Sequence, residues 1–536
     1  MHPYVVEEFT PSETDVLRRY FTNLEGPVFA LVNLPDVVKG ALFARYSRSS
    51  KSLRRLFLDE FVGDLDLTGD SGVDARVGLD RAAELYQRIF YEYGDDSVAQ
   101  LGGVHLACEQ ASNVLTKVLE RGRLMSYLEQ STRYLGYDRR LPNGLYRYYR
   151  DAAVLESKRG ARYVGEMDRM FDTYGEVLTA LTEWLTQRFP KTAEDTDFVY
   201  RQAIRAKALD ASRGLLPASA ISNLGIYASG QAYEALLLRM RAHALPEVRE
   251  YAELMLAELM KVIPSFLKRV DVAERGGAWT TYLERSRSAT ADLVRSTWRD
   301  TDPPAPAELV SLVDFDPDGE RRVVEAIVFE ASSMSMAEVT RRVGAMNELE
   351  RTHLIKTYVG ARLNRRHRPG RAFERTDYRF ELVTDYGAFR DLQRHRLLTI
   401  EWQPLGTQLG FDVPEVVVEA GLAETYSESV VRSAELYDDL ASEFPQQCQY
   451  AVALAFRIRY SIQMNAREAM HLIELRSGPQ GHPSYRRVAQ EMARQLRDVA
   501  GHHAIADAMT FVDLSDTDLE RLEAERAAER SRRGRA

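Results

Sequence analysis

The segment ERGRLMSYLEQSTRY, residues 120–134, gathers side chains suited to binding an anionic ligand. They are Arg121, Arg123, Glu129, Ser131 and Arg133. Guanidinium groups bind phosphate through paired N–H donors, a hydroxyl can donate or accept, and a carboxylate accepts from a sugar or a ring N–H. This set therefore suits a nucleotide monophosphate. The alternative is a solvated helix, in which Ser126, Glu129 and Arg133 share one stripe and Glu129 pairs with Arg133.

The segment NAREAMHLIELR, residues 465–476, also has two interpretations. Asn465 stands three residues before Glu468, which is the arrangement of an ordinary helix start with an asparagine cap. The alternative is a functional seat for a flavin or a pyrophosphate. A helix N-terminus that carries Arg467 would attract such a group, because its unpaired N–H groups and the guanidinium all favour anions.

Helices must position most of these residues. Apolar residues recur at helical spacing in segments such as RAAELYQRIFYEY and EVLTALTEWLTQRF, so the sequence predicts a helix-rich chain. Two segments indicate strands: residues 321–331 (RRVVEAIVFEA) begin with a β-branched run, and residues 377–389 (DYRFELVTDYGAF) alternate aromatic and polar side chains.

The length of 536 residues predicts more than one domain. Proline and aspartate concentrate in residues 299–322, which indicates a linker. We therefore expect a first domain at residues 1–298 and a second at residues 323–515, called the first and second halves below. Residues 516–536 read as a charged helical tail.

The composition narrows the classes of partner. A formal net charge of -9 argues against a long nucleic-acid track, which needs clustered positive charge. The N-terminus is acidic and has no signal-peptide core, and no run of about 18 apolar residues exists. We expect a cytoplasmic protein with no nucleic-acid or membrane partner. Cys108 and Cys448 lie in apolar runs and should be buried and inert, and no cluster of cysteine and histidine predicts a metal site.

Two pairs of segments recur in the same order in both halves. ERGRLMS (120–126) resembles QRHRLLT (393–399), and LLLRMRAHALPEVREYAELM (236–255) resembles IELRSGPQGHPSYRRVAQEM (473–492). The corresponding residues are Arg121 and Arg394, Arg123 and Arg396, and Arg239 and Arg476. This correspondence predicts a duplicated unit on either side of the linker.

These segments resemble the signature of the flavin-dependent thymidylate synthases, Arg-His-Arg followed by Ser, Glu, Ser, Arg and Tyr at fixed intervals. Residues 121–134 match it except at its histidine, here Gly122, and its asparagine, here Leu128. Further family segments are matched in the first half by Arg213, Arg239, His243 and Glu247. The second half matches through Arg394, His395, Arg396, Asn465, Arg467, His471 and Arg476.

The resemblance implies reductive methylation of dUMP to dTMP. The one-carbon group would come from methylenetetrahydrofolate, with FAD as cofactor and NADPH as reductant. It also implies a helix-rich α/β (α+β) fold, with two tandem domains forming a pseudo-dimer. A homodimer of such chains would imitate the homotetramer of the family.

The resemblance assigns roles to residues as well. An arginine near the uracil ring would stabilise the ring as an anion, and we expect Arg476, or failing that Arg239, in this catalytic role. The residues expected to bind substrate are Arg121, Glu129, Ser131, Arg133, Arg213 and Arg394. Those expected to bind FAD are Ser97, Arg123, Arg394, His395, Arg396, Asn465, Arg467 and His471.

Each half departs from the signature in a different place. The first half keeps the uridylate-binding set but has YASGQAYE (227–234) where Asn-Ala-Arg is expected. The second half keeps the flavin-side residues but has Trp402, Pro404 and Gly406 where Glu, Ser and Arg are expected. We therefore expect one composite site built by both halves. The alternatives are a methylase of another uridylate and a non-catalytic nucleotide- or flavin-binding paralogue.

A basic cluster surrounds His367 in residues 361–371 (ARLNRRHRPGR), with five arginines. Such a run is commonly a solvated loop. The alternative is a docking loop for the phosphates of FAD or NADPH.

Overall fold

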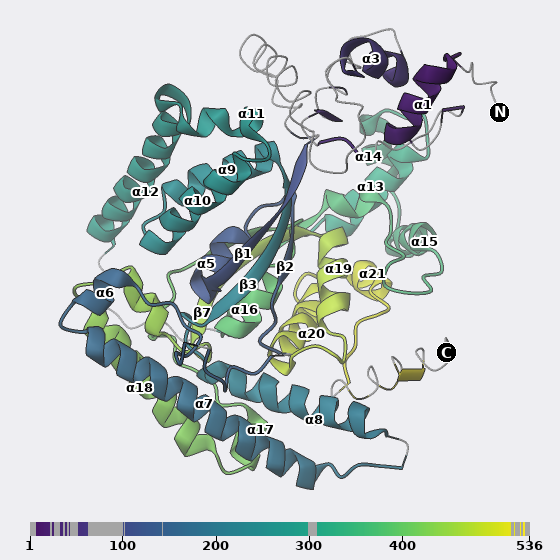
Figure 1. Ribbon diagram of the computed structural model, residues 1–536. Coiled ribbons are helices and arrows are strands. Elements are labelled where there is room, and N and C mark those ends of the chain that lie inside the picture. The colour runs from purple at the N-terminus through teal and green to yellow at the C-terminus, as the bar shows by residue number, and fades with distance from the viewer. Residues whose placement is uncertain are drawn as a thin grey trace. The chain divides into compact units, whose positions relative to one another are not determined.

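The computed structural model describes residues 7–21, 52–62, 102–298 except 134, 142 and 194, and 308–515, with isolated residues near both ends. Figure 1 shows the helices and strands along the chain, which divides into two compact units. Unit 1 comprises Met1–Glu109, Leu124–Glu129 and Asn223–Arg299, and unit 2 comprises Gln110–Arg123, Gln130–Ser222 and Asp300–Ala536. This partition differs from the division into halves, because unit 2 contains segments of both. The two domains expected from the sequence stay a prediction.

Unit 1 is built around a three-stranded sheet in the order β1-β3-β2. Its strands are β1 (Gly103–Ser112), β2 (Met125–Glu129) and β3 (Ile221–Ser229), of which the ends of β1 and β3 belong to unit 2. The hydroxyl of Tyr233, a buried residue of α9, donates to Val104 O (3.0 Å) and Ile226 O (3.2 Å), which fixes α9 to β1 and β3. Its helices are α1 (Pro11–Tyr20), α3 (Leu53–Glu60), α9 (Gly230–Arg241), α10 (Pro246–Leu259), α11 (Pro264–Leu267) and α12 (Ala278–Thr297).

Unit 2 holds a four-stranded antiparallel sheet in the order β4-β5-β7-β6. Its strands are β4 (Val310–Phe315), β5 (Asp377–Asp385), β6 (Thr399–Trp402) and β7 (Arg457–Asn465). Its helices are α5 (Asn113–Leu119), α6 (Ala152–Glu156), α7 (Gly160–Arg188), α8 (Asp197–Ser212), α13 (Gly319–Glu330), α14 (Met336–Gly344), α15 (Glu348–Val359), α16 (Tyr386–Leu392), α17 (Glu415–Glu419), α18 (Ala423–Ala441), α19 (Ala466–Arg476), α20 (Pro483–Asp498) and α21 (His503–Ala508).

The order of elements is repeated along the chain. β1, α5, β2, α7, β3, α9 and α10 have the same order as β5, α16, β6, α18, β7, α19 and α20. The strands also pair in the same order, β1-β3-β2 in one sheet and β5-β7-β6 within the other. The capping residues correspond too, because Ser112 and Asp385 cap α5 and α16, and Ser229 and Asn465 cap α9 and α19. The duplication expected from the sequence is therefore visible in the elements.

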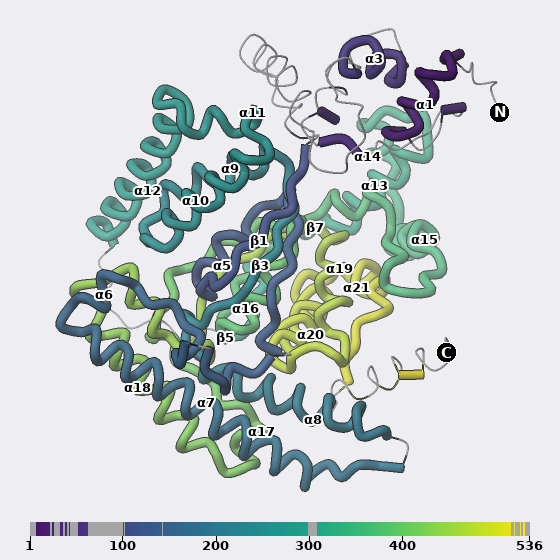
Figure 2. The backbone as a smooth tube through the Cα atoms, in the orientation of Figure 1, coloured from purple at the N-terminus to yellow at the C-terminus, as the bar shows by residue number. Residues whose placement is uncertain are grey.

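Segments from the two halves meet inside unit 2. The long helices α7 and α18 run side by side there (Figure 2), and Arg432 of α18 pairs with Glu166 of α7 at 2.6 Å. Two loops meet reciprocally, through the bonds Ala218 N to Val452 O (2.8 Å), Leu454 N to Leu216 O (2.8 Å), Ser219 N to Tyr450 O (3.2 Å) and Ala455 N to Gly214 O (2.9 Å). Because Ala218 corresponds to Leu454 and Leu216 to Val452, the two loops contact each other in the same way.

Several expectations about individual segments are wrong. Residues 125–129 are strand β2, not a helix, because they pair with Leu224–Ala228 of β3. Residues 321–330 belong to helix α13, not to a strand, since Val323, Val324 and Ile327 lie at helical spacing on its buried face. Strand β4 and the start of α13 fall within residues 299–322, so that segment is not a linker throughout.

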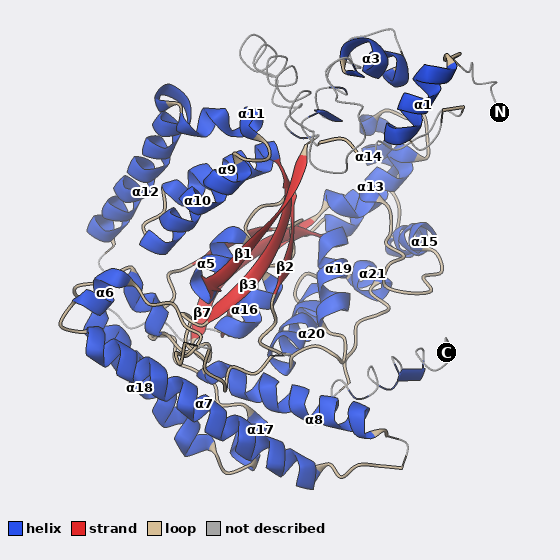
Figure 3. Ribbon diagram, viewed as in Figure 1, coloured by secondary structure: helices blue, strands red, loops and turns tan. Residues whose placement is uncertain are grey.

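Other expectations are confirmed. The described chain is rich in helices (Figure 3), although both sheets are antiparallel in their recorded pairings, which makes the fold α+β. Residues 377–385 of the expected strand 377–389 form strand β5, but residues 386–389 lie in helix α16. Cys108 and Cys448 are both buried.

Within the described part of the chain, none of the helices has the length and apolar character needed to cross a bilayer.

Candidate functional site

An arginine cluster lies in unit 2, where residues of both halves meet. Arg133 forms a paired contact with Asp210 of α8, from Nε to Oδ1 (2.7 Å) and from Nη2 to Oδ2 (2.6 Å). Its Nη1 donates to the hydroxyl of Tyr485 in α20 (2.8 Å). The guanidinium of Arg476, at the end of α19, lies 5.4 Å from the centre of the same Tyr485 ring. Arg133, Asp210, Arg213, Asp391, Arg476 and Tyr485 are called the arginine cluster below.

Arg213 is the least satisfied member of this cluster. It begins the short helix after α8, and its Nη1 lies 3.3 Å from Asp391 Oδ2. Its Nη2 is buried and makes no hydrogen bond to any residue that the structure describes, with Asp385 Oδ1 at 3.9 Å. The backbone at Gly387 allows this approach, because a Cβ there would lie 2.8 Å from Arg213 Nη2. A buried N–H group without an acceptor is costly and marks a place where a ligand oxygen would be stabilising.

Asp391 stands among positive charges. Burial acts to raise the pKa of Asp391, but Arg213, Arg394, Arg476 and Arg133 hold it well below its usual range, so this carboxylate is ionised. Burial acts in the same sense on Asp210, and its contact with Arg133 lowers that pKa as well. The cluster therefore combines charges of both signs in one buried region.

A second group of residues adjoins Arg476. Arg476 Nε donates to His395 Nε2 (3.0 Å), and His395 Nδ1 lies 3.0 Å from Glu468 Oε1. The side chains of His395 and Glu468 are 3% and 4% exposed. Burial, with the Arg476 charge, lowers the pKa of His395 to about 4, so its ring is neutral at pH 7. His471 Nδ1 also contacts Glu468, at 3.4 Å.

Local structure explains these positions. Asn465 caps α19 by accepting from Glu468 N (2.9 Å), which places Glu468 and His471 one turn apart on that helix. His482 is the N-terminal capping residue of α20, and its Nε2 lies 3.1 Å from Asp210 O. Burial and the Arg213 charge lower the pKa of His482 to about 4. The helices α19 and α20 therefore position Arg476 and Tyr485 in the same cluster.

Arg121 and Arg123, the Arg-x-Arg pair of the first half, contact residues of the second half. Arg123 Nη2 donates to Thr399 Oγ1 (2.9 Å) and Leu398 O (3.2 Å). Arg121 lies over the ring of Trp402, with 5.0 Å from its guanidinium carbon to the ring centre. Trp402, which departs from the family signature, is thus a contact surface for an arginine of the first half.

The other residues expected to bind substrate or FAD do not all lie in the arginine cluster. Arg394 and Arg396 are exposed, and Ser131 Oγ accepts from Arg133 N (3.2 Å). Arg467 donates to Pro369 O (2.9 Å) and pairs with Glu374 (3.3 Å). Glu129 and Arg239 belong to unit 1. Ser97 and Tyr134 lie outside the described residues.

The basic cluster at 361–371 is partly a structural element. Arg362 is buried and forms a paired contact with Glu474 of α19, at 2.6 Å on both sides. Arg366, Arg368 and Arg371 are exposed, and Arg371 pairs with Glu374 at 3.0 Å. The solvated-loop interpretation describes these three residues, but it does not describe Arg362.

Sequence reasoning missed the acidic and aromatic partners. Asp210 stands three residues before Arg213, and Asp391 stands three residues before Arg394. This repeated Asp-x-x-Arg spacing was the available signal, because residues three apart lie on one face wherever a segment is helical. Tyr485 and Glu468 had no signal of that kind, since their partners come from distant segments.

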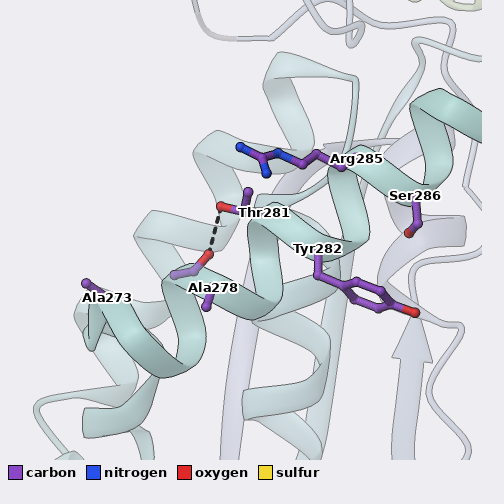
Figure 4. A pocket seen from close by; sticks show the side chains of 7 residues that line it. Ala273, Ala278, Thr281, Tyr282, Arg285 and Ser286 are labelled. Carbon is purple, nitrogen blue, oxygen red and sulfur yellow. Dashed lines mark hydrogen bonds between the residues drawn. The ribbon is translucent and has the colours of Figure 1, made fainter.

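A pocket lies elsewhere, in unit 1, along the first turns of α12 (Figure 4). Its volume is about 480 Å³, and Tyr282, Arg285 and Ser286 are among its lining residues. Thr281 Oγ1 donates to Gly277 O (3.0 Å) at its edge. Among the residues predicted for substrate or cofactor that the structure describes, none lines it.

A family profile described as thymidylate synthase complementing protein matches residues 42–265 and 311–501, which is most of the chain. The chain belongs to the thymidylate synthase complementing protein family. The two matched segments lie on either side of residues 299–310, as the duplicated signature predicts.

The chain is also similar to proteins that it matches over nearly their whole length. A UPF0159 protein of Chlamydia muridarum is 38% identical over 522 residues, covering 97% of this chain and 98% of the relative. UPF0159 proteins of Chlamydia pneumoniae and Thermoplasma acidophilum are 38% and 32% identical, over 525 and 513 residues, covering 97% and 91% of this chain and 98% and 97% of the relatives.

Among solved structures, the chain is similar to a UMP/dUMP methylase from Streptomyces cacaoi, bound with 5-Br dUMP. The identity is 16% and the TM-score 0.32, and the match covers 39% of this chain and 96% of that one.

Proposed function

We propose that this thymidylate synthase complementing protein is a flavin-dependent thymidylate synthase that methylates dUMP at one composite site. One observation carries the proposal. Arg133 of the first half and Arg476 of the second half both contact Tyr485, at 2.8 Å from Nη1 to the hydroxyl and 5.4 Å from the ring centre. Residues expected on the substrate side and the catalytic arginine thus share one buried cluster.

In this proposal, Arg133 and Arg213 bind the phosphate of uridylate. The chemistry of the donors fits, because Arg213 Nη2 is buried and lacks an acceptor among the described residues. A phosphate oxygen would provide that acceptor in a charge-assisted hydrogen bond. Arg476 would stabilise negative charge on the uracil ring, and its partial burial strengthens this effect because less water screens it.

The donor set also fits a flavin dinucleotide. Arg394 and Arg396, which flank buried His395 in the sequence, are exposed, and Arg467 lies in the first turn of α19 with 30% of its side chain exposed. Guanidiniums and a helix N-terminus are the usual donors to a pyrophosphate. When bound, reduced FAD would supply the hydride of the reaction, with NADPH and methylenetetrahydrofolate as co-substrates.

We further propose that the two halves form a pseudo-dimer and that two chains associate as a homodimer. A two-fold contact between copies pairs residue i with j and residue j with i. The bonds Ala218 N to Val452 O and Leu454 N to Leu216 O have this reciprocal form. Each chain then has one such phosphate site, because the position of the second half that corresponds to Arg213 is occupied by Gln449.

Asp391 favours a second candidate substrate, a uridine ribonucleotide. Its carboxylate is ionised and 14% exposed, beside Arg213. A carboxylate accepts hydrogen bonds from sugar hydroxyls, and a ribose offers one more hydroxyl than a deoxyribose. Titration with UMP beside dUMP therefore distinguishes the two candidates.

The test is an absorbance spectrum of the purified protein reconstituted with FAD, followed by titration with dUMP or UMP while the flavin bands are recorded. We expect flavin to bind and the nucleotide to perturb its bands. Arg213→Gln copies Gln449, and it should weaken the nucleotide response about 10- to 100-fold, as expected for a lost charged hydrogen bond. Arg467→Ala should weaken flavin binding instead.

The matched control is Arg432→Gln, which changes an arginine of α18 that pairs with Glu166 of α7 and is 40% exposed. It should leave both bindings unchanged. A colourless protein that cannot be reconstituted with FAD would refute the enzyme proposal and favour a non-catalytic paralogue.

A further inference from the structure

The carboxylate of Glu468 contacts two histidines in the interior of unit 2. This carboxylate is 4% exposed and lies 3.0 Å from His395 Nδ1 and 3.4 Å from His471 Nδ1. Burial acts to raise the pKa of Glu468, but hydrogen bonds from the two histidines lower it to about 2. The carboxylate is therefore a fixed negative charge, and the capping motif at Asn465 uses the backbone of Glu468 but not this side chain.

The contact with Arg476 shows which nitrogen of His395 carries a proton. An arginine Nε–H can only donate, so His395 Nε2, at 3.0 Å, must be the acceptor. In the neutral ring the proton is then on Nδ1, where it is donated to Glu468 Oε1. Glu468, His395 and Arg476 thus form one directed chain of hydrogen bonds.

The same geometry argues against a metal ion at these residues. His395, Glu468 and His471 offer ligand atoms within 4.8 Å of one another, as a metal site would. A metal on His395 Nδ1 would move the proton to Nε2, because a ligating histidine donates from its other nitrogen. That N–H would face the N–H of Arg476, so two donors would meet. The hydrogen-bond chain is the arrangement that satisfies every group.

We infer that Glu468 is a positioning residue, which fixes the tautomer and ring orientation of His395 and thereby holds the guanidinium of Arg476 in the arginine cluster. This inference rests on the proposed function for the role of Arg476 in binding uridylate, but the hydrogen-bond chain itself does not. With Nε held by His395, the two terminal nitrogens of Arg476 are the donors left for Tyr485 and a ligand.

The chain is tested first by ¹⁵N NMR of the full-length protein labelled at histidine, with the His395 signals assigned by their loss in His395→Gln. At pH 7 we expect His395 to have a protonated Nδ1 and an unprotonated Nε2. In Glu468→Leu, which offers Nδ1 no acceptor, this preference should be lost, whereas Glu468→Gln keeps an acceptor oxygen and should retain it. A protonated Nε2 in the unmodified protein, or an unchanged tautomer in Glu468→Leu, would overturn the inference whether or not uridylate binds.

The action through Arg476 is tested by a double-mutant cycle on the dissociation constant of dUMP, measured by calorimetry with FAD present. Glu468→Gln should weaken binding about tenfold, and in combination with Arg476→Lys it should add little to the loss from Arg476→Lys alone. The control Glu474→Gln changes an equally buried carboxylate of α19 that pairs with Arg362, and its effect should multiply with that of Arg476→Lys. If the fold-losses in dUMP affinity from Glu468→Gln and Arg476→Lys multiply in the double variant, the two residues act independently and the inference is overturned.

A second pair of variants applies if Glu468→Gln does not fold. The amide of His395→Gln can accept from Arg476 and donate to Glu468, whereas His395→Leu can do neither. His395→Gln should therefore retain most of the dUMP affinity that His395→Leu loses. Equal losses would contradict a positioning role. If the unmodified protein binds no dUMP, the proposed function fails. The NMR result alone then shows whether the hydrogen bonds from Arg476 through His395 to Glu468 exist as inferred.

Discussion

At the scale of residues, Arg133 shows how the site is held together. Its guanidinium is 11% exposed and is matched by Asp210, which is 8% exposed. A buried pair of this kind adds little net stability compared with apolar residues, but removing one partner leaves an unpaired buried charge. Arg133 therefore has two separable roles, one in folding and one in the proposed phosphate site.

Arg133→Ala should lower the free energy of unfolding by about 3–5 kcal/mol, because Asp210 is left without its partner. Adding Asp210→Ala should restore much of this loss, but it should not restore nucleotide binding. Urea denaturation measures the first effect, and the flavin titration measures the second. Arg341→Ala, at an exposed pair with Glu338, serves as the control and should leave stability unchanged. Equal stability of the Arg133 and Arg341 variants would contradict this account.

At the scale of elements, the reciprocal loops join the two halves within unit 2. Gly214 supplies the carbonyl that accepts from Ala455 N (2.9 Å) and packs against α18. A Cβ at Gly214 would lie 2.0 Å from the hydroxyl of Tyr426 and 3.2 Å from Ala455 Cβ. Tyr426 is 1% exposed and has no room to move, so this glycine is required by close packing.

Gly214→Ala should therefore lower the free energy of unfolding by about 1–3 kcal/mol, the usual cost of an overpacked core. The matched change is Gly165→Ala, in the interior of α7, where an added Cβ meets nothing within 4 Å. That variant should gain about 0.5–1 kcal/mol, because alanine is the better helix former. Urea midpoints compare the two, and a stable Gly214 variant would show that the loops can separate.

At the scale of the whole molecule, buried neutral histidines link stability to pH. Burial lowers the pKa of His395 and of His482 to about 4, with the charges of Arg476 and Arg213 acting in the same direction. In the unfolded chain a histidine has its ordinary pKa of about 6.5. The unfolded chain therefore takes up protons between pH 6.5 and 4 that the folded protein does not.

The free energy of unfolding should accordingly be constant above about pH 7 and fall as the pH drops from 6.5 towards 4. The slope should reach about 1.4 kcal/mol per pH unit for each histidine. Urea unfolding at pH 7.5, 6 and 5 measures it, and His482→Asn should make the slope smaller. Carboxylates such as Glu468 lose their contribution only below about pH 4.5, so they do not account for a change between pH 6.5 and 5. Equal stability at pH 7.5 and 5 would exclude the buried neutral state.

Local patterns in the sequence were enough for several features. Asn465 three residues before Glu468 predicted a capped helix, and the cap is present. Alternation in residues 377–389 predicted a strand, which residues 377–385 form, and apolar neighbours predicted that Cys108 and Cys448 are buried. The repeated motifs predicted a duplication and the family. Each of these depends on interactions between residues that are close in sequence, or on a signature carried by the residues themselves.

Tertiary structure decided the rest. Residues 125–129 are a strand because β3, far along the chain, offers them a hydrogen-bonding edge. Arg133, chosen for a phosphate, is held by Asp210 and Tyr485, which approach it only when α8 and α20 pack together. The proton of His395 is likewise placed by Arg476 and Glu468. The residue types therefore determined what chemistry was available, whereas charge pairing and tautomer depend on distances between segments that only the folded chain brings together.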